Sequence, residues 1–173
     1  MDNLVMIGMP GSGKSTVGVV LAKAAGMDFV DSDLVIQKEM GMTLAQIIER
    51  YGDDGFRQIE NRVNASLDCH GTVIATGGSV VYGEDAMRHL QHIGTVIYLQ
   101  VSCEEISARL GDLHARGVTF APGQTLQSLY EERRPLYERY ADITLPCDGL
   151  TIPQVIEALR ARLECFQRSP FPA

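Results

Sequence analysis

The chain has 173 residues, about the length of one ordinary domain, so we expect a single domain over residues 1–173. Hydrophobic residues make up 45% of the sequence and charged residues 21%, a globular composition that argues against a disordered or fibrous chain. Fifteen Lys and Arg against 22 Asp and Glu give a formal charge of −7, so the chain lacks the broad positive field that non-specific binding to nucleic acid or anionic membranes needs. Any anionic ligand must therefore be held by a few focused groups.

The sequence carries no sign of a membrane span, a secretion signal or a metal cluster. No apolar run is long enough to cross a bilayer, and residues 1–9 lack the charged-then-apolar layout of a signal peptide. The four cysteines have no Cys-x-x-Cys spacing, and the four histidines fit no ligand spacing, which favours free thiols over a metal site or a disulfide framework. We therefore expect a cytoplasmic protein, in a reducing compartment, and a monomer.

Apolar runs and helical patterns alternate along the chain. Apolar, β-branched runs without polar alternation predict strands buried on both faces, and apolar residues at helical spacing, with capping pairs, predict helices between them. In chain order we expect a strand at 4–7, a helix over 14–25, a strand at 29–30, a helix directly after residue 33, helices over 44–51 and about 54–67, a strand at 72–75, a helix around 89–92, a strand at 96–101, a helix after 102, a helix over 126–140, a strand at 143–145 and a closing helix after 151.

Strands that alternate with helices predict a three-layer α/β fold built on a doubly wound parallel sheet. One segment breaks the pattern, because residues 113–123 are polar and contain Gly117, Pro122 and Gly123. We expect a mobile loop there and a frayed tail over residues 169–173.

A glycine-rich segment joins the first strand to the first helix and reads Gly8-Met9-Pro10-Gly11-Ser12-Gly13-Lys14-Ser15. It fits the phosphate-loop pattern G-x-x-x-x-G-K-[ST] at every fixed position, in the strand-to-helix context that the pattern requires. The structural alternative is a glycine-rich turn that merely tolerates a lysine. Pattern and context together favour a nucleoside-triphosphate site.

Each residue of this phosphate loop has a chemical task on a triphosphate that carries Mg²⁺. The N–H groups of Gly11, Ser12 and Gly13 would form an anion-binding nest at the positive end of the helix. Lys14 would reach the β- and γ-phosphates and act in catalysis, because its ammonium group is a point charge. The Ser15 hydroxyl would be a ligand of Mg²⁺, and the Thr16 hydroxyl would donate a hydrogen bond to the α-phosphate.

The rest of the sequence narrows what is done with the triphosphate. An Asn-Lys-x-Asp segment, which guanine-reading regulatory GTPases need, is absent, and the chain is short for a motor or transporter ATPase domain. Asp31 and Asp33 follow the second strand, at the sheet edge where open α/β folds bind ligands. A pair of helix N-caps is the alternative for these two carboxylates. Together these features indicate phosphoryl transfer to a small acceptor.

Five segments, in this order and spacing, resemble the shikimate kinase family of P-loop metabolite kinases: Gly8 to Thr16, Asp31-Ser32-Asp33, Phe56-Arg57-Gln58-Ile59-Glu60, Thr76-Gly77-Gly78 and Glu132-Arg133-Arg134-Pro135-Leu136-Tyr137. The resemblance implies a P-loop fold like that of nucleoside-monophosphate kinases, with ATP and Mg²⁺ as cofactors. It also implies an acceptor-binding region at about 33–62, a mobile lid at about 111–124 and a small hydroxylated carboxylate as the substrate.

The resemblance also implies a role for individual residues. Asp31 would help to hold Mg²⁺ with Ser15, while Asp33 would position or deprotonate the acceptor hydroxyl. Arginine forks suit a planar carboxylate, and the family's carboxylate-binding positions are Arg57 and Arg133. The remaining implied contacts are backbone N–H groups of Gly77 and Gly78 at the acceptor, Arg109 and Pro153 on the adenine side, and the lid arginine Arg116, which would stabilise the transferring phosphoryl group.

Two departures from the family pattern bear on the choice of acceptor. Ser79 stands where the family has a third glycine, and the lid reads Arg116-Gly117-Val118-Thr119 where the family has Arg-Pro-Leu-Leu. Shikimate is the leading acceptor, and Ser79 could add a hydrogen bond to a different hydroxy acid such as homoserine. A nucleotide-binding regulatory module without transfer activity is a third hypothesis.

Overall fold

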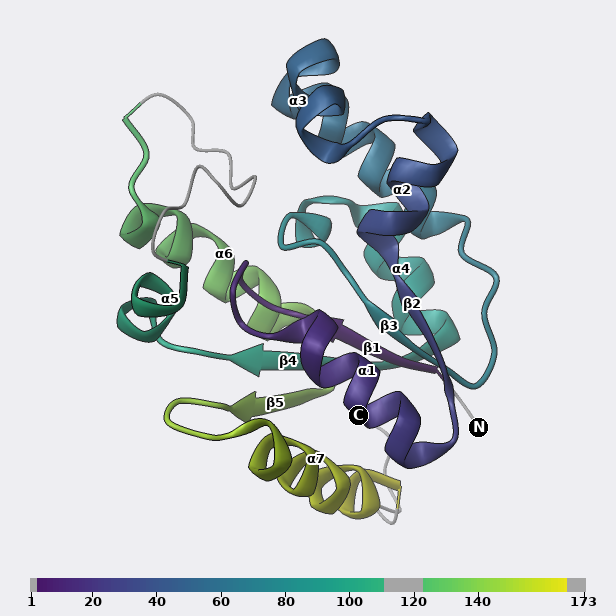
Figure 1. The fold of residues 1–173 in the computed structure, drawn as a ribbon, viewed down its shortest axis with the longest axis vertical. Coiled ribbons are helices and arrows are strands. Elements are labelled where there is room, and N and C mark those ends of the chain that lie inside the picture. The colour runs from purple at the N-terminus through teal and green to yellow at the C-terminus, as the bar shows by residue number, and fades with distance from the viewer. Residues whose placement is uncertain (1–2, 111–122, 168–173) are drawn as a thin grey trace.

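The computed structural model describes residues 3–110 and 123–167 (Figure 1). Five strands form one parallel sheet in the order β2-β3-β1-β4-β5, and their bounds are β1 Asn3–Ile7, β2 Asp28–Asp31, β3 Thr72–Ala75, β4 Gly94–Gln100 and β5 Ile143–Pro146. Every residue of β1 and β3 is buried, as expected for strands covered on both faces.

Helices cover both faces of the sheet. Figure 1 shows α1 and α7 on one side and α4 and α6 on the other, which makes the three layers that the sequence predicts. The helical bounds are α1 Lys14–Ala25, α2 Ser32–Met40, α3 Leu44–Ala65, the short 3-10 helix η1 Val80–Tyr82, α4 Glu84–Ile93, α5 Cys103–Leu110, α6 Leu126–Tyr140 and α7 Ile152–Gln167. Across the described residues, no helix combines the length and the apolarity needed to cross a membrane.

One predicted helix begins earlier in the structure than expected. The helix expected directly after Asp33 begins at Ser32, because the Asp31 side chain already accepts a hydrogen bond from the Asp33 N–H and caps the helix there. The two helices expected at 44–51 and about 54–67 lie on either side of Gly52 within α3. Their division is confirmed, because the Gly52 φ of 70° and ψ of 178° are not helical.

The strand order brings three chain segments to one edge of the sheet. Ala75 at the end of β3 pairs with Met6 of β1 on one side and with Asp31 of β2 on the other. The segments that leave these strands therefore begin side by side. A second, separate cluster of buried side chains joins α2 to α3 above this edge: Ile36, Ile47 and Val63.

Asn3 ties the opposite edge of the sheet together. It is only 1% exposed, and its Nδ2 donates to the carbonyls of Cys69 at 2.6 Å and Ile93 at 3.0 Å. Its Oδ1 accepts from the Thr72 N–H at 3.0 Å. One side chain thus satisfies three backbone groups: a carbonyl before β3, a carbonyl before β4 and the first N–H of β3.

We expect Asn3→Ala to lower the free energy of unfolding by about 3 kcal/mol, because it leaves buried backbone groups without partners. Urea titration followed by circular dichroism measures the change. Gln91→Ala is the control, since Gln91 makes one exposed bond to the Tyr140 carbonyl, and it should change stability by less than about 0.5 kcal/mol. Equal effects of the two substitutions would contradict this role of Asn3.

Candidate active site

The phosphate loop has the backbone conformation of an anion-binding turn. Gly8 and Gly13 have φ angles of 146° and 96°, which side chains rarely adopt, and a Cβ on Gly8 would lie 2.8 Å from the Leu99 carbonyl oxygen. Gly13 caps α1 without any side-chain hydrogen bond. The first N–H groups of α1 are therefore left to a ligand at the positive end of the helix.

Lys14 lies at the floor of this loop and is only 8% exposed. Its Nζ donates to the carbonyl oxygens of Gly8 and Met9, both at 2.9 Å. Burial lowers the pKa of Lys14 to about 8, and the carboxylate of Asp33 opposes that shift. A phosphate group beside this ammonium would stabilise its charge in the same way.

Ser15 and Asp31 form a pair of oxygen donors at the start of α1. The Ser15 hydroxyl donates to Asp31 Oδ2 at 2.7 Å, while Asp31 Oδ1 accepts from the Asp33 N–H at 3.0 Å. Asp31 thus caps α2 with one oxygen, as the alternative interpretation of this carboxylate expects, and faces Ser15 with the other. A hydroxyl and a carboxylate suit Mg²⁺. Among residues 3–110 and 123–167 no cluster of three His, Cys, Asp or Glu could hold a metal alone, so the triphosphate and water would complete the shell.

Asp33 lies in the first turn of α2 and is not an N-cap. Its Oδ1 is buried and accepts no hydrogen bond from the described residues. Burial raises the pKa of Asp33 to about 6, Asp31 raises it further and Lys14 opposes the shift. An unpartnered carboxylate oxygen beside the phosphate loop is free to accept from an acceptor hydroxyl.

Glu60 is a second buried carboxylate at the same place, and no individual role was predicted for it. It is 1% exposed; its Oε2 accepts from the Ser79 hydroxyl at 2.5 Å, and its Oε1 has no partner among the described residues. A Cβ on Gly77 would overlap Glu60 Oε1 and lie 2.9 Å from Asp33 Oδ1. Both unpartnered oxygens therefore converge on Gly77, where only glycine leaves room.

Ser79, predicted to contact the acceptor, lines the cleft, and its hydroxyl donates a hydrogen bond to Glu60. Burial raises the pKa of Glu60 to about 7, while this hydrogen bond and the charges of Arg133 and Arg57 lower it and Asp33 raises it. A signal for Glu60 was present in the sequence, one helical turn after Arg57 in a matched segment. Its burial and its bond to Ser79 depend on packing between distant segments.

Both predicted carboxylate-binding arginines reach the same cleft from different helices. Arg133 of α6 is 6% exposed, whereas Arg57 of α3 is exposed. Both guanidinium groups lie against the ring of Tyr82, at 4.2 Å for Arg57 and 5.3 Å for Arg133. A Cβ on Gly78 would lie 3.1 Å from Arg133 Nη1, so this glycine permits the close approach of the turn.

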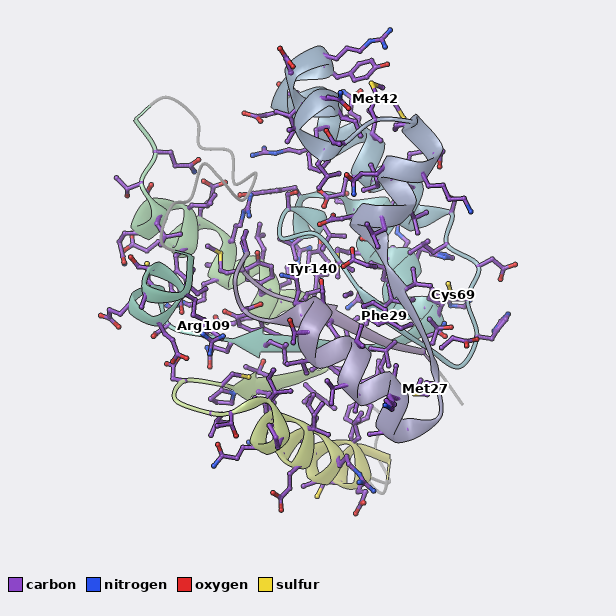
Figure 2. All side chains as sticks on the ribbon, in the orientation of Figure 1. Met27, Phe29, Met42, Cys69, Arg109 and Tyr140 are labelled. Atoms are coloured by element: carbon purple, nitrogen blue, oxygen red, sulfur yellow. The ribbon has the colours of Figure 1, made fainter. Side chains whose placement is uncertain are left out.

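The predicted adenine-side residues have different positions. Arg109, labelled in Figure 2, comes from α5. Its Nη1 donates to the carbonyls of Gly11 and Ser12 at 3.4 Å, and its guanidinium is paired with Glu105. Pro153 is exposed and is not among the residues that line the cleft, although its neighbour Ile152 is. Arg116 and the expected lid, apart from residues 123–124, lie outside the described residues.

A cleft of about 620 Å³ brings the two halves of the site together. The phosphate loop lines one part of it, and Cys147, Leu150, Ile152 and Val155 provide an apolar wall. The predicted acceptor residues line the same cleft: Asp33, Arg57, Gly77, Gly78, Ser79 and Arg133. Its geometry can therefore hold a nucleotide phosphate chain next to a carboxylate-bearing acceptor.

Comparisons with known proteins identify the family. A family model described as "Shikimate kinase" matches residues 10–164. A shikimate kinase from Haemophilus influenzae is 39% identical over 150 residues, covering 84% of this chain and 83% of its own. One from Pasteurella multocida is 41% identical over 150 residues, covering 84% and 86%.

The chain belongs to the shikimate kinase family. Solved structures agree: a shikimate kinase from Acinetobacter baumannii in complex with shikimate has a TM-score of 0.87 at 29% identity, covering 98% of this chain and 96% of that one. Another from Aquifex aeolicus has a TM-score of 0.79 at 30% identity, covering 94% and 96%. The family and the three-layer P-loop fold predicted from the sequence are confirmed.

We expect Glu60→Gln to change how stability depends on pH. Because burial raises the pKa of Glu60 from 4.5 to about 7, the folded protein keeps a proton that the unfolded chain releases between these values. The free energy of unfolding of the wild type should therefore fall, relative to that of the variant, by up to about 3 kcal/mol as the pH rises from 5 to 8.

Denaturant titrations at half-unit pH steps measure this difference. Glu157→Gln, at an exposed position on α7, is the control and should give a curve parallel to that of the wild type. A Glu60→Gln curve that also runs parallel would refute titration of Glu60 in the folded state.

Proposed function

We propose that this chain transfers the γ-phosphoryl group of ATP to a hydroxyl group of shikimate. The observation that carries the proposal is that Asp33 lines one cleft together with the phosphate loop and the two arginines. Membership of the shikimate kinase family supports the same reaction. A kinase must hold two anions with the acceptor hydroxyl close to both, and this set of groups suits that task.

The nucleotide side would rely on the phosphate loop. N–H groups at the start of α1 and the Lys14 ammonium would hold the phosphates and stabilise the charge on the transferring group. Arg109, next to the loop carbonyls, and the apolar wall would face the base. Ser15 and Asp31 would hold Mg²⁺, which would neutralise phosphate charge when bound.

On the acceptor side, Arg57 and Arg133 would bind the carboxylate and thereby fix the ring of shikimate. Asp33 would accept the hydrogen bond of the reacting hydroxyl and take its proton as the oxygen attacks phosphorus. Backbone N–H groups of Gly77 and Gly78 would support the acceptor from the turn after β3. Arg116 stays a prediction for the stabilisation of the transferring group.

Alternative functions receive less support from the site. The case for another hydroxy acid such as homoserine rested on Ser79 and on the lid sequence, and the Ser79 hydroxyl already donates to Glu60. A regulatory module without transfer activity would not need an unpartnered carboxylate oxygen at Asp33 beside the phosphate loop. We therefore place shikimate first.

We also propose that the protein acts as a monomer in the cytoplasm. Four free cysteines suit a reducing compartment. Light scattering coupled to gel filtration tests the first point, and a dimer mass would refute it.

In the presence of Mg²⁺, we expect the rate of ADP release from ATP with shikimate to be far above the rate without an acceptor. The reason is that the bound hydroxyl displaces water as the nucleophile. Coupled detection of ADP measures the rate, with homoserine and gluconate as parallel acceptors. No stimulation by shikimate would contradict the proposed function. Stimulation by another acceptor alone would move the assignment to that hydroxy acid.

We expect Arg133→Ala to raise the KM for shikimate roughly 10- to 100-fold while changing the KM for ATP by less than about threefold, because it removes a charge-assisted contact worth about 1.5–3 kcal/mol. Arg134→Ala is a matched control on the same helix, since Arg134 is exposed and forms an ion pair with Glu138. Steady-state kinetics with each substrate varied in turn measure both constants. An equal loss for both substrates would refute the assigned role.

A further inference from the structure

Tyr82 lies behind the two arginines of the proposed acceptor site. It is the last residue of η1, it is half-buried, and it is not among the residues that line the cleft. The guanidinium carbons of Arg57 and Arg133 lie 4.2 Å and 5.3 Å from the centre of its ring. Both distances are within the range in which a cation is attracted to the electrons of an aromatic ring.

The hydroxyl of Tyr82 is also engaged on both sides. It accepts a hydrogen bond from Arg133 Nε at 3.3 Å and donates one to Glu132 Oε1 at 2.5 Å. Glu132 in turn accepts from Gln124 Nε2 at 3.0 Å. These bonds fix the ring in one orientation, because a phenol has one donor hydrogen and its oxygen can accept at the same time.

The two arginines need such a support because they carry like charges and converge on one small volume. Among residues 3–110 and 123–167, neither guanidinium lies within ion-pairing distance of a carboxylate. A carboxylate partner would orient them, yet it would also compete with the carboxylate of a substrate. The face of an aromatic ring orients a guanidinium without cancelling its charge, and Tyr82 accepts a hydrogen bond from Arg133 only at Nε.

We propose that Tyr82 is a positioning residue that holds Arg57 and Arg133 together as a receptor for the acceptor's carboxylate and so contributes to selection of a carboxylate-bearing substrate. This inference rests on the proposed function, because the acceptor is taken to be shikimate. Tyr82 acts through the arginines and does not touch the acceptor. It comes from the turn after β3, whereas the arginines come from α3 and α6, so it joins three separate parts of the chain.

Two substitutions separate the ring from the hydroxyl. Tyr82→Leu removes both the ring and the hydroxyl, and we expect it to raise the KM for shikimate about tenfold, with the KM for ATP and kcat changed by less than about threefold. Tyr82→Phe keeps the ring, and we expect its KM for shikimate to stay within about threefold of the wild type.

A matched control removes a similar contact elsewhere. Tyr140 at the end of α6 also has an arginine over its ring, Arg139 at 5.4 Å, but neither residue lines the cleft. Tyr140→Leu should leave the KM for shikimate unchanged within about twofold.

The methyl ester of shikimate isolates the carboxylate. Its hydroxyl groups are those of shikimate, but it has no negative charge for the arginines to bind. We expect Tyr82→Leu to lower kcat/KM for shikimate about tenfold and kcat/KM for the ester by less than about twofold. A purely structural role of Tyr82 would lower both values equally, and that result would overturn the proposal.

The test of Tyr82 and the test of the proposed function can fail independently of each other. Turnover of shikimate by the wild type decides the function, and the ratio of variant to wild type decides the role of Tyr82. If Tyr82→Leu fails to fold, as judged by circular dichroism, Tyr82→Met takes its place in the comparison of shikimate with the ester. A loss of about tenfold for shikimate alone would support the role of the ring, and an equal loss for both substrates would overturn it.

Discussion

The arrangement of the site depends on charges that balance one another in a place with little water. Lys14, Glu60 and Arg133 are buried, and Asp33 lies among them. An isolated lysine would lose its proton in such surroundings and an isolated carboxylate would gain one, since burial disfavours the charged form. Two cationic and two anionic side chains offset this cost for each other. Each of them therefore depends on the position of the other three.

The strand order is what makes this balance possible. The phosphate loop leaves β1 toward α1, whereas the turn at Gly77 leaves the adjacent strand β3 toward α4 on the other side of the sheet. Neighbouring strands whose connections diverge to opposite faces open a crevice at their carboxyl ends. Asp31 at the end of β2 borders the same edge. Residues far apart in sequence thus share one cleft, because the connections after β1 and β3 run to opposite faces of the sheet.

The sequence was most informative where a local pattern decides the structure. The phosphate loop could be predicted because its glycines, its lysine and the flanking strand and helix lie within one short segment. Glu60 and Tyr82 could not be placed in the same way, since their surroundings come from α2, α3, α6 and the turn after β3. The hydrogen bond between Ser79 and Glu60 could not be predicted for the same reason. Pairing between distant segments is set by tertiary packing, which a local pattern does not encode.

The formal charge of −7 is compatible with a site for two anions because charge is distributed unevenly. Burial raises the pKa of Asp33 to about 6 and that of Glu60 to about 7, so these carboxyl groups carry less negative charge near neutral pH than exposed ones do. The arginines keep their charge at any such pH. The electrostatic potential inside the cleft is therefore more positive than the composition of the chain implies. A bound anion would stabilise the charged form of the cationic groups that it contacts. An acidic surface then repels anions in general, while the few focused groups in the cleft select those that fit.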